Sequence, residues 1–138
     1  MQEIRKKVLI CMKEYNYNLQ NASKDFWKER TWKVFEDGSV DYIETYCLSG
    51  TKIYRWIGSR RRLERWYSRL KEQYYQENYD ESVPGYDGVV MNVAYLGNNG
   101  KLIDVFHGYF HKGVKCAWII RRLRRIVRSA AEVVDCEV

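Results

Sequence analysis

The sequence is poor in the residues that divide a chain or bind common metals. Pro84 is the single proline in 138 residues, so no proline-rich linker separates two domains. There are only two histidines, and no two cysteines form a Cys-x-x-Cys pair, so the usual zinc-ligand spacings are absent. The first apolar run, Val8 to Met12, is too short for a signal-peptide core or a membrane span. We therefore expect one domain, residues 1–138, in the cytoplasm and without a membrane partner.

Signatures of catalysis are also lacking. The sequence contains no Gly-x-Ser-x-Gly, no Walker phosphate-binding loop and no His-Glu-x-x-His helix. We therefore expect a protein that is not an enzyme and that needs no cofactor. Because the cytoplasm is reducing, we also expect thiols rather than disulfides at the four cysteines, which are Cys11, Cys47, Cys116 and Cys136.

The sequence does contain abundant apolar residues and an uneven charge. Hydrophobic residues make up 46% and charged residues 30%, which is typical of a folded globular domain. The net charge of +6 comes from two blocks: residues 51–76 carry eight basic and two acidic side chains, and residues 105–138 carry seven and three. The block between them, residues 77–104, carries one basic and five acidic side chains. This polarity predicts a surface that attracts an acidic partner.

Two stretches have the periodicity of amphipathic helices. The first follows Ser59, a residue type that caps helix N-termini, and the second covers residues 113–134. Apolar residues such as Leu70 and Leu123 share one face of each helix, and we expect that face to be buried. The opposite faces carry arginines, namely Arg61, Arg62, Arg65 and Arg69 in the first helix and Arg121, Arg124, Arg125 and Arg128 in the second.

The remaining segments favour strands. Residues 4–15 also match a helix face, but their β-branched and aromatic content favours a strand. Turn residues at 37–39, 48–51 and 97–100 separate further extended runs, and residues 101–110 predict a strand kinked or bulged at Gly108. The predicted order is β-β-β-β-α-β-β-α. This order indicates an α+β fold, an antiparallel sheet of a meander plus a hairpin, with both arginine-rich helices packed on one face.

The turn and strand residues also carry a resemblance. The pattern is Trp32-x-Val34-x-x-Asp37-Gly38-Ser39-Val40-x-Tyr42, with Asp87-Gly88 and Gly108-Tyr109-Phe110-x-x-Gly113 later in the chain. In these positions the chain resembles small uncharacterised α+β accessory proteins of Gram-positive bacteria and their mobile elements. Some short accessory proteins of this kind inhibit bacterial defence systems, and anti-CRISPR proteins are among them. The resemblance implies the fold and an accessory or inhibitory role, but no inhibitory residue can be carried over from turn and strand positions.

The arginines are the strongest functional signal in the sequence. A surface selected only for solubility would tolerate lysine and would mix charges of both signs, whereas arginine fills nearly every basic position of the two helices. The planar guanidinium group binds phosphate and carboxylate oxygens through two parallel hydrogen bonds. We therefore predict a small non-enzymatic binding protein, an anti-CRISPR-like accessory or inhibitor. Its eight helix arginines would contact an acidic protein or nucleoprotein, such as an RNA-guided nuclease.

Three alternative functions stay open. The arginine faces are also compatible with two solvated helix surfaces that bind nothing. A direct DNA- or RNA-binding protein would use the same arginines for phosphates. A metal-dependent hydrolase or nuclease would instead use the acidic loop that contains Asp80, Glu81 and Asp87.

Aromatic residues and histidines near these helices give weaker signals. We interpret Trp56, Trp66, Tyr67 and Tyr74 as core residues rather than as platforms for stacked bases. His107 and His111 would lie about 13 Å apart along a strand, so we predict no metal site from them and Cys116.

Overall fold

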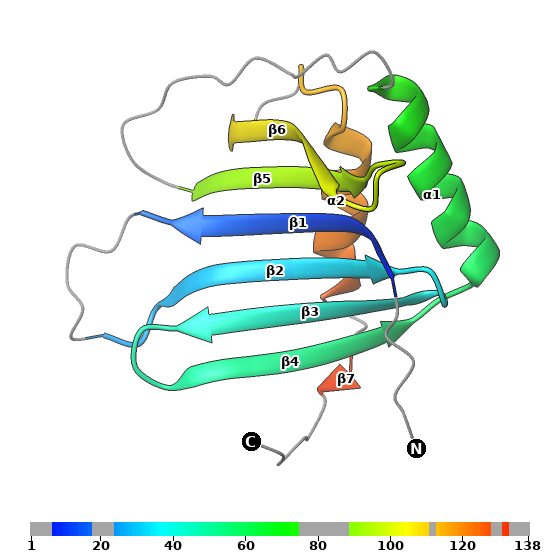
Figure 1. Cartoon of the computed structure of the whole chain (residues 1–138). Helices are drawn as coiled ribbons and strands as arrows, with labels where there is room; N and C mark the ends of the chain where they lie inside the picture. The colour runs from blue at the N-terminus through cyan, green and yellow to red at the C-terminus, as the bar shows by residue number, and fades with distance from the viewer. Residues whose placement is uncertain (1–6, 18–23, 75–88, 111–112, 128–130, 133–138) are drawn as a thin grey trace.

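An antiparallel sheet of seven strands forms the framework of the protein (Figure 1). The computed structural model describes residues 7–17, 24–74, 89–110, 113–127 and 131–132. The strands are β1 (Val8–Asn16), β2 (Trp27–Phe35), β3 (Ser39–Tyr46), β4 (Gly50–Ile57), β5 (Val89–Leu96), β6 (Leu102–Tyr109) and β7 (Ala131–Glu132). The helices are α1 (Arg60–Gln73) and α2 (Ala117–Ile126).

The strand order in the sheet is β6-β5-β1-β2-β3-β4-β7. Strands β1 to β4 form a meander, and the hairpin of β5 and β6 joins the other side of β1. The first strand therefore lies in the interior of the sheet. Figure 1 shows α2 behind the sheet, running across the strands, and α1 beside the end at which β4 leads into it. Neither of the two described helices covers the front face in that view.

The core is centred on one row of large side chains that crosses the sheet. Met12 of β1 pairs with Trp32, Trp32 with Tyr42, and Tyr42 with Tyr54 in successive strands. The ring centroids of Trp32 and Tyr42 are 4.8 Å apart, and those of Tyr42 and Tyr54 are 5.7 Å apart. Cross-strand pairs of this kind stabilise a sheet because the side chains are close on one face.

Both helices bury an apolar face in the same core cluster. The fully buried residues of α1 include Leu63 and Leu70, and those of α2 include Ile119, Ile120 and Leu123. Each such side chain contributes about 1.5–3 kcal/mol through its removal from water. The apolar faces therefore set how both helices are turned toward the sheet.

Local turn and cap chemistry agrees with the sequence. Gly38 has a φ of +97° in the β2–β3 turn, and Asp37 Oδ1 accepts hydrogen bonds from the backbone N of Ser39 (2.9 Å) and from its Oγ (2.6 Å). Ser59 caps α1, because its Oγ accepts a hydrogen bond from the backbone N of Arg62 at 3.2 Å. The expected α+β class, the strand at β1, this turn and this cap are confirmed.

Two expectations about secondary structure were wrong. The second helix ends at Ile126 and does not continue to residue 134, because residues 131 and 132 pair as β7 with Arg55 and Tyr54 on the edge of β4. The irregularity in β6 lies at Val105, where the pairing skips from Asp104 to Phe106, and not at Gly108. The edge of β4 offers unpaired backbone groups, and these favour the added strand β7 over a further turn of α2.

The cysteines match the expectation as far as the structure describes them. Cys11, Cys47 and Cys116 form no disulfide, and Cys136 lies outside the described residues. Burial raises the pKa of the Cys11 thiol above its ordinary value, which keeps this thiol protonated and unreactive. Within the described part of the chain, neither helix is long and apolar enough to span a membrane.

Replacing Leu70 by alanine should lower the free energy of unfolding by about 2–5 kcal/mol, because this fully buried side chain fills space between α1 and the sheet. The matched control is Leu48→Ala, since Leu48 is 63% exposed and its loss should cost less than about 0.5 kcal/mol. Urea denaturation followed by circular dichroism measures both. Equal stabilities for the two variants would contradict the packing of α1 described above.

Candidate functional site

A cleft between α1 and α2 brings arginines of both helices together. We call it the arginine cleft; its volume is about 540 Å³. Its lining residues are Trp56, Arg62, Arg65, Trp66, Arg69, Arg122, Arg125 and Ile126. One tryptophan comes from the end of β4, and the other lining residues come from the two helices. A volume of this size lies within the range of about 300–1,000 Å³ that is usual for ligand pockets.

Helix periodicity places three arginines of α1 along one wall. Arg62, Arg65 and Arg69 are separated by three and four residues, so they lie on one side of the helix. The adjacent buried face contains Leu63 and Leu70, which press the helix onto the core. The arginine side chains therefore project along the cleft and not into the core.

Aromatic rings hold two of these guanidinium groups. The Cζ atom of Arg69 lies 4.1 Å from the ring centroid of Trp118 on α2. The Cζ atom of Arg122 lies 5.1 Å from the same ring and 5.8 Å from that of Trp66. Cation–π contacts fix the planes of the guanidinium groups without neutralising their charge, so their N–H groups stay available to an anion.

Trp118 and Gln73 tie the end of α1 to the start of α2. Trp118 Nε1 donates a hydrogen bond to Gln73 Oε1 at 2.8 Å, and Gln73 Nε2 donates one to the backbone O of Lys115 at 3.1 Å. The ring on which Arg69 stacks is thus anchored to the helix that carries Arg69 itself. This contact joins the C-terminal end of α1 to the N-terminal end of α2.

The charge in the arginine cleft has no acidic counterpart among the described residues. Among the described residues, the ion pairs that include an arginine of α1 or α2 are Arg60–Glu64 and Arg124–Glu14, with a nitrogen–oxygen distance of 3.1 Å in each. Neither includes an arginine of the cleft. Five guanidinium groups therefore face one another across a concave surface whose low-dielectric walls concentrate the positive field.

The structure brings together only part of the predicted arginine set. Arg62, Arg65, Arg69 and Arg125 line the cleft, whereas Arg61 and Arg121 are exposed elsewhere on the helices. Arg128 lies outside the described residues.

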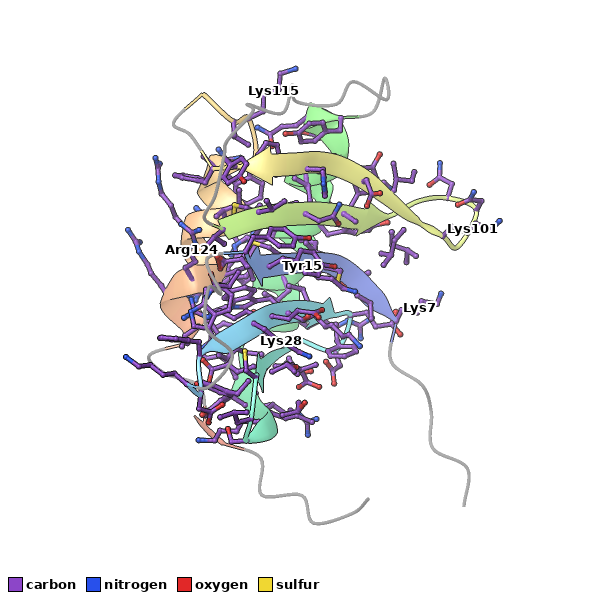
Figure 2. The ribbon with its side chains drawn as sticks, turned by 90° about the vertical axis from the view of Figure 1, so that its left-hand side faces the viewer. Lys7, Tyr15, Lys28, Lys101, Lys115 and Arg124 are labelled. Carbon is purple, nitrogen blue, oxygen red and sulfur yellow. The ribbon has the colours of Figure 1, made fainter. Side chains whose placement is uncertain are left out.

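Arg124 points to the sheet and not to the cleft. Its Nη2 atom lies 3.1 Å from Oε2 of Glu14, a carboxylate on β1 with only 3% of its side chain exposed. Figure 2 shows Arg124 at the junction of α2 and the sheet, while Lys7 and Lys101 project on the side of the sheet away from α2. The loss of Arg124 would leave this buried carboxylate without its cation, so we expect Arg124 to contribute to stability.

Sequence reasoning missed Arg122 and undervalued the tryptophans of the cleft. Arg122 follows Trp118 by four residues, and this spacing on a helix is the signal that could have found their contact. Trp66 and Tyr74 belong to the core as expected, with Trp66 8% exposed. Trp56 is half-buried and lies at the edge of the core, where it lines the cleft.

A second polar cluster lies on the sheet beneath α2. Glu14 of β1 lies opposite Arg30 of β2 in the strand register, and the buried atoms Glu14 Oε1, Arg30 Nε and Trp32 Nε1 have no hydrogen-bond partner among the described residues. Nearby, the Tyr42 hydroxyl donates a hydrogen bond of 2.7 Å to Glu44. Burial is the main reason why the pKa of Tyr42 lies far above its ordinary value, and this hydrogen bond raises it further. The phenol therefore stays protonated.

Metal and acidic-loop chemistry has no support from the described residues. They contain no group of three or more His, Cys, Asp or Glu side chains that could hold a metal ion. His107 is exposed on β6, and His111 lies outside the described residues. The acidic loop with Asp80, Glu81 and Asp87 also lies outside them.

Comparison with family models, curated proteins and solved structures found no match to this chain. The geometry of the site therefore carries the functional argument.

The ion pair with Glu14 predicts unequal effects for two arginines of α2. Arg124→Met should lower the free energy of unfolding by about 1–3 kcal/mol, because Glu14 then keeps a buried charge without its cation. Arg121→Met is the matched control and should change stability by less than about 0.5 kcal/mol. Adding Glu14→Gln to Arg124→Met should recover part of the loss, because it removes the unpaired charge. Urea denaturation measures wild type and these three variants, and a double variant that is no more stable than Arg124→Met would contradict a coupled pair.

Proposed function

We propose that this is a non-enzymatic binding protein whose arginine cleft holds the acidic groups of a macromolecular partner. The observation that carries the proposal is the set of five cleft arginines without a carboxylate partner in the described part of the chain. Each guanidinium group offers a planar fork for the oxygens of a phosphate or a carboxylate. A bound anion would offset the repulsion that these like charges exert on one another.

The concave placement of the charge distinguishes this cleft from a solvated helix face. On a solvated face the guanidinium groups point apart into water and need no fixed orientation. Here two of them, Arg69 and Arg122, are held on the ring of Trp118, and both helices turn arginines toward the same space. Pre-oriented groups lose less conformational entropy when a ligand binds, so they favour binding.

Two candidate functions, which differ in the kind of partner, are compatible with the proposal. An accessory or inhibitor protein of the anti-CRISPR type would bind an acidic protein or nucleoprotein target, and the resemblance of its turn and strand positions supports this role. A direct nucleic-acid-binding protein would place phosphates on the same arginines, and the two tryptophans in the cleft favour this candidate.

Reversing two charges, one on each wall of the cleft, should strongly weaken binding without unfolding the protein. We expect Arg65→Glu with Arg125→Glu to weaken binding to an oligonucleotide or a polyglutamate peptide by about tenfold or more for each arginine, because each lost contact to a charged group costs roughly 1.5–3 kcal/mol. The difference between variant and wild type should shrink at high salt, where screening weakens the attraction. Fluorescence anisotropy with labelled probes measures both effects.

The matched control reverses two exposed arginines of the same helices that do not line the cleft, Arg61→Glu with Arg121→Glu. Both double variants change the net charge equally, so non-specific attraction should fall by the same amount in each. A similar loss of affinity in both would show that total charge, not the cleft, governs binding.

A further inference from the structure

Trp56 presents a fixed aromatic surface in the arginine cleft. It lies near the end of β4, and its ring is nearly parallel to that of Trp66, with 6.4 Å between centroids and 10° between planes. The other neighbour is Gly58, where a Cβ atom would overlap the six-membered ring of Trp56. A glycine at this position therefore leaves the space that the ring occupies, and two neighbours fix its orientation.

The two stacked rings differ in how much of their surface is exposed. Trp66 is only 8% exposed and contacts the core, so it supports its neighbour rather than a ligand. Trp56 is half-buried and shares the cleft with the arginines of both helices. An indole ring held beside arginines can stack on a planar group of a ligand whose anionic groups the arginines bind.

The arginine row on α1 is long enough to contact more than one phosphate of a nucleic-acid strand. From Arg62 to Arg69 the helix rises about 10 Å, at 1.5 Å per residue. Every nucleotide of a strand carries one phosphate charge, so three arginines along this length can contact neighbouring phosphates. An acidic protein segment would satisfy the arginines, but its carboxylates would leave the face of Trp56 without a stacking partner.

The shape of the site favours a single strand over a duplex. A protein reads a duplex by inserting a protruding helix or ribbon into its groove, and its bases are stacked inside. The arginine cleft is instead a hollow of about 540 Å³ between two helices, and only an unstacked base can reach a ring inside it.

From this combination we infer that the arginine cleft binds single-stranded nucleic acid, with one unstacked base on Trp56 and the neighbouring phosphates on the arginines of α1 and α2. This inference rests on the proposed function of the cleft and names its ligand class. It gives Trp56 a role that a general anion site does not need. Gly58 is then a positioning residue, because it sets the orientation of the ring.

The test compares a ligand that has bases with one that has none. A labelled single-stranded oligonucleotide and inorganic polyphosphate are each titrated into wild type, Trp56→Ala and Trp56→Phe. Trp56→Ala should weaken oligonucleotide binding by about tenfold and leave polyphosphate binding unchanged, since one stacked base is lost and the arginines are intact. Trp56→Phe should retain most of the affinity because it keeps an aromatic face.

Two further variants control for position and for folding. Gly58→Ala should reproduce the selective loss, because the added methyl group displaces the ring of Trp56. Trp27→Ala removes another half-buried tryptophan that does not line the cleft, and it should leave both affinities unchanged. Thermal melting of each variant separates a loss of stacking from a loss of structure.

The possible outcomes separate this inference from the proposed function. If Trp56→Ala binds the oligonucleotide like wild type while Arg65→Glu with Arg125→Glu does not, the cleft binds anions but no base, and the inference is wrong. Tighter binding to polyglutamate or to a duplex than to the single strand would also overturn it. If no anionic probe depends on the cleft arginines, the proposed function itself fails.

Discussion

The hydrogen bond between Trp118 and Gln73 is the contact on which the arginine cleft depends. It joins two helices whose facing surfaces carry charges of one sign, and the same indole ring supports Arg69 and Arg122. Like charges at 4 Å repel by about 1 kcal/mol in water, and salt reduces this further. Each fully buried leucine or isoleucine of these helices contributes about 1.5–3 kcal/mol in the opposite direction. Apolar burial therefore holds the helices together, and the side-chain contact sets their spacing.

Because apolar burial fixes how α2 is turned, the arginines of α2 lie in surroundings that differ from one another. Arg122 and Arg125 face α1, while Arg124 reaches Glu14 on β1. A helix that lies between a sheet and a second helix presents three surroundings within one turn: the apolar core, polar side chains of the sheet, and the cleft. Arginine is compatible with the last two because its long stem packs on apolar surface while its charged end finds either a carboxylate or water. The residue type alone does not reveal which of these surroundings it meets.

Local chemistry made part of the fold predictable. The Asp37-Gly38-Ser39 turn and the Ser59 cap follow from neighbouring residues only, and both were predicted correctly. Arg122 was missed because its place in the cleft depends on where α1 packs against α2. The periodicity of α2 alone carries no information about that packing. The pair of Glu14 and Arg124, and the pairing of residues 131–132 with β4, join distant parts of the chain, and no local pattern specifies them. The sequence could therefore indicate which helices carry the arginines. It could not indicate which arginines pair with the sheet and which line the cleft.

The interior position of β1 has a consequence for how the chain acquires its structure during synthesis. Its partner β2 follows it closely in the chain, whereas its other partner, β5, which pairs Tyr95 with Ile10, is translated much later. One side of β1 therefore stays unpaired until β5 has been made, and a search for so distant a partner is slow. A nascent chain thus exposes Ile10 and Met12 until β5 has been translated. The order of synthesis, and not only the final contacts, therefore determines how long this apolar strand can be captured by chaperones or by other chains.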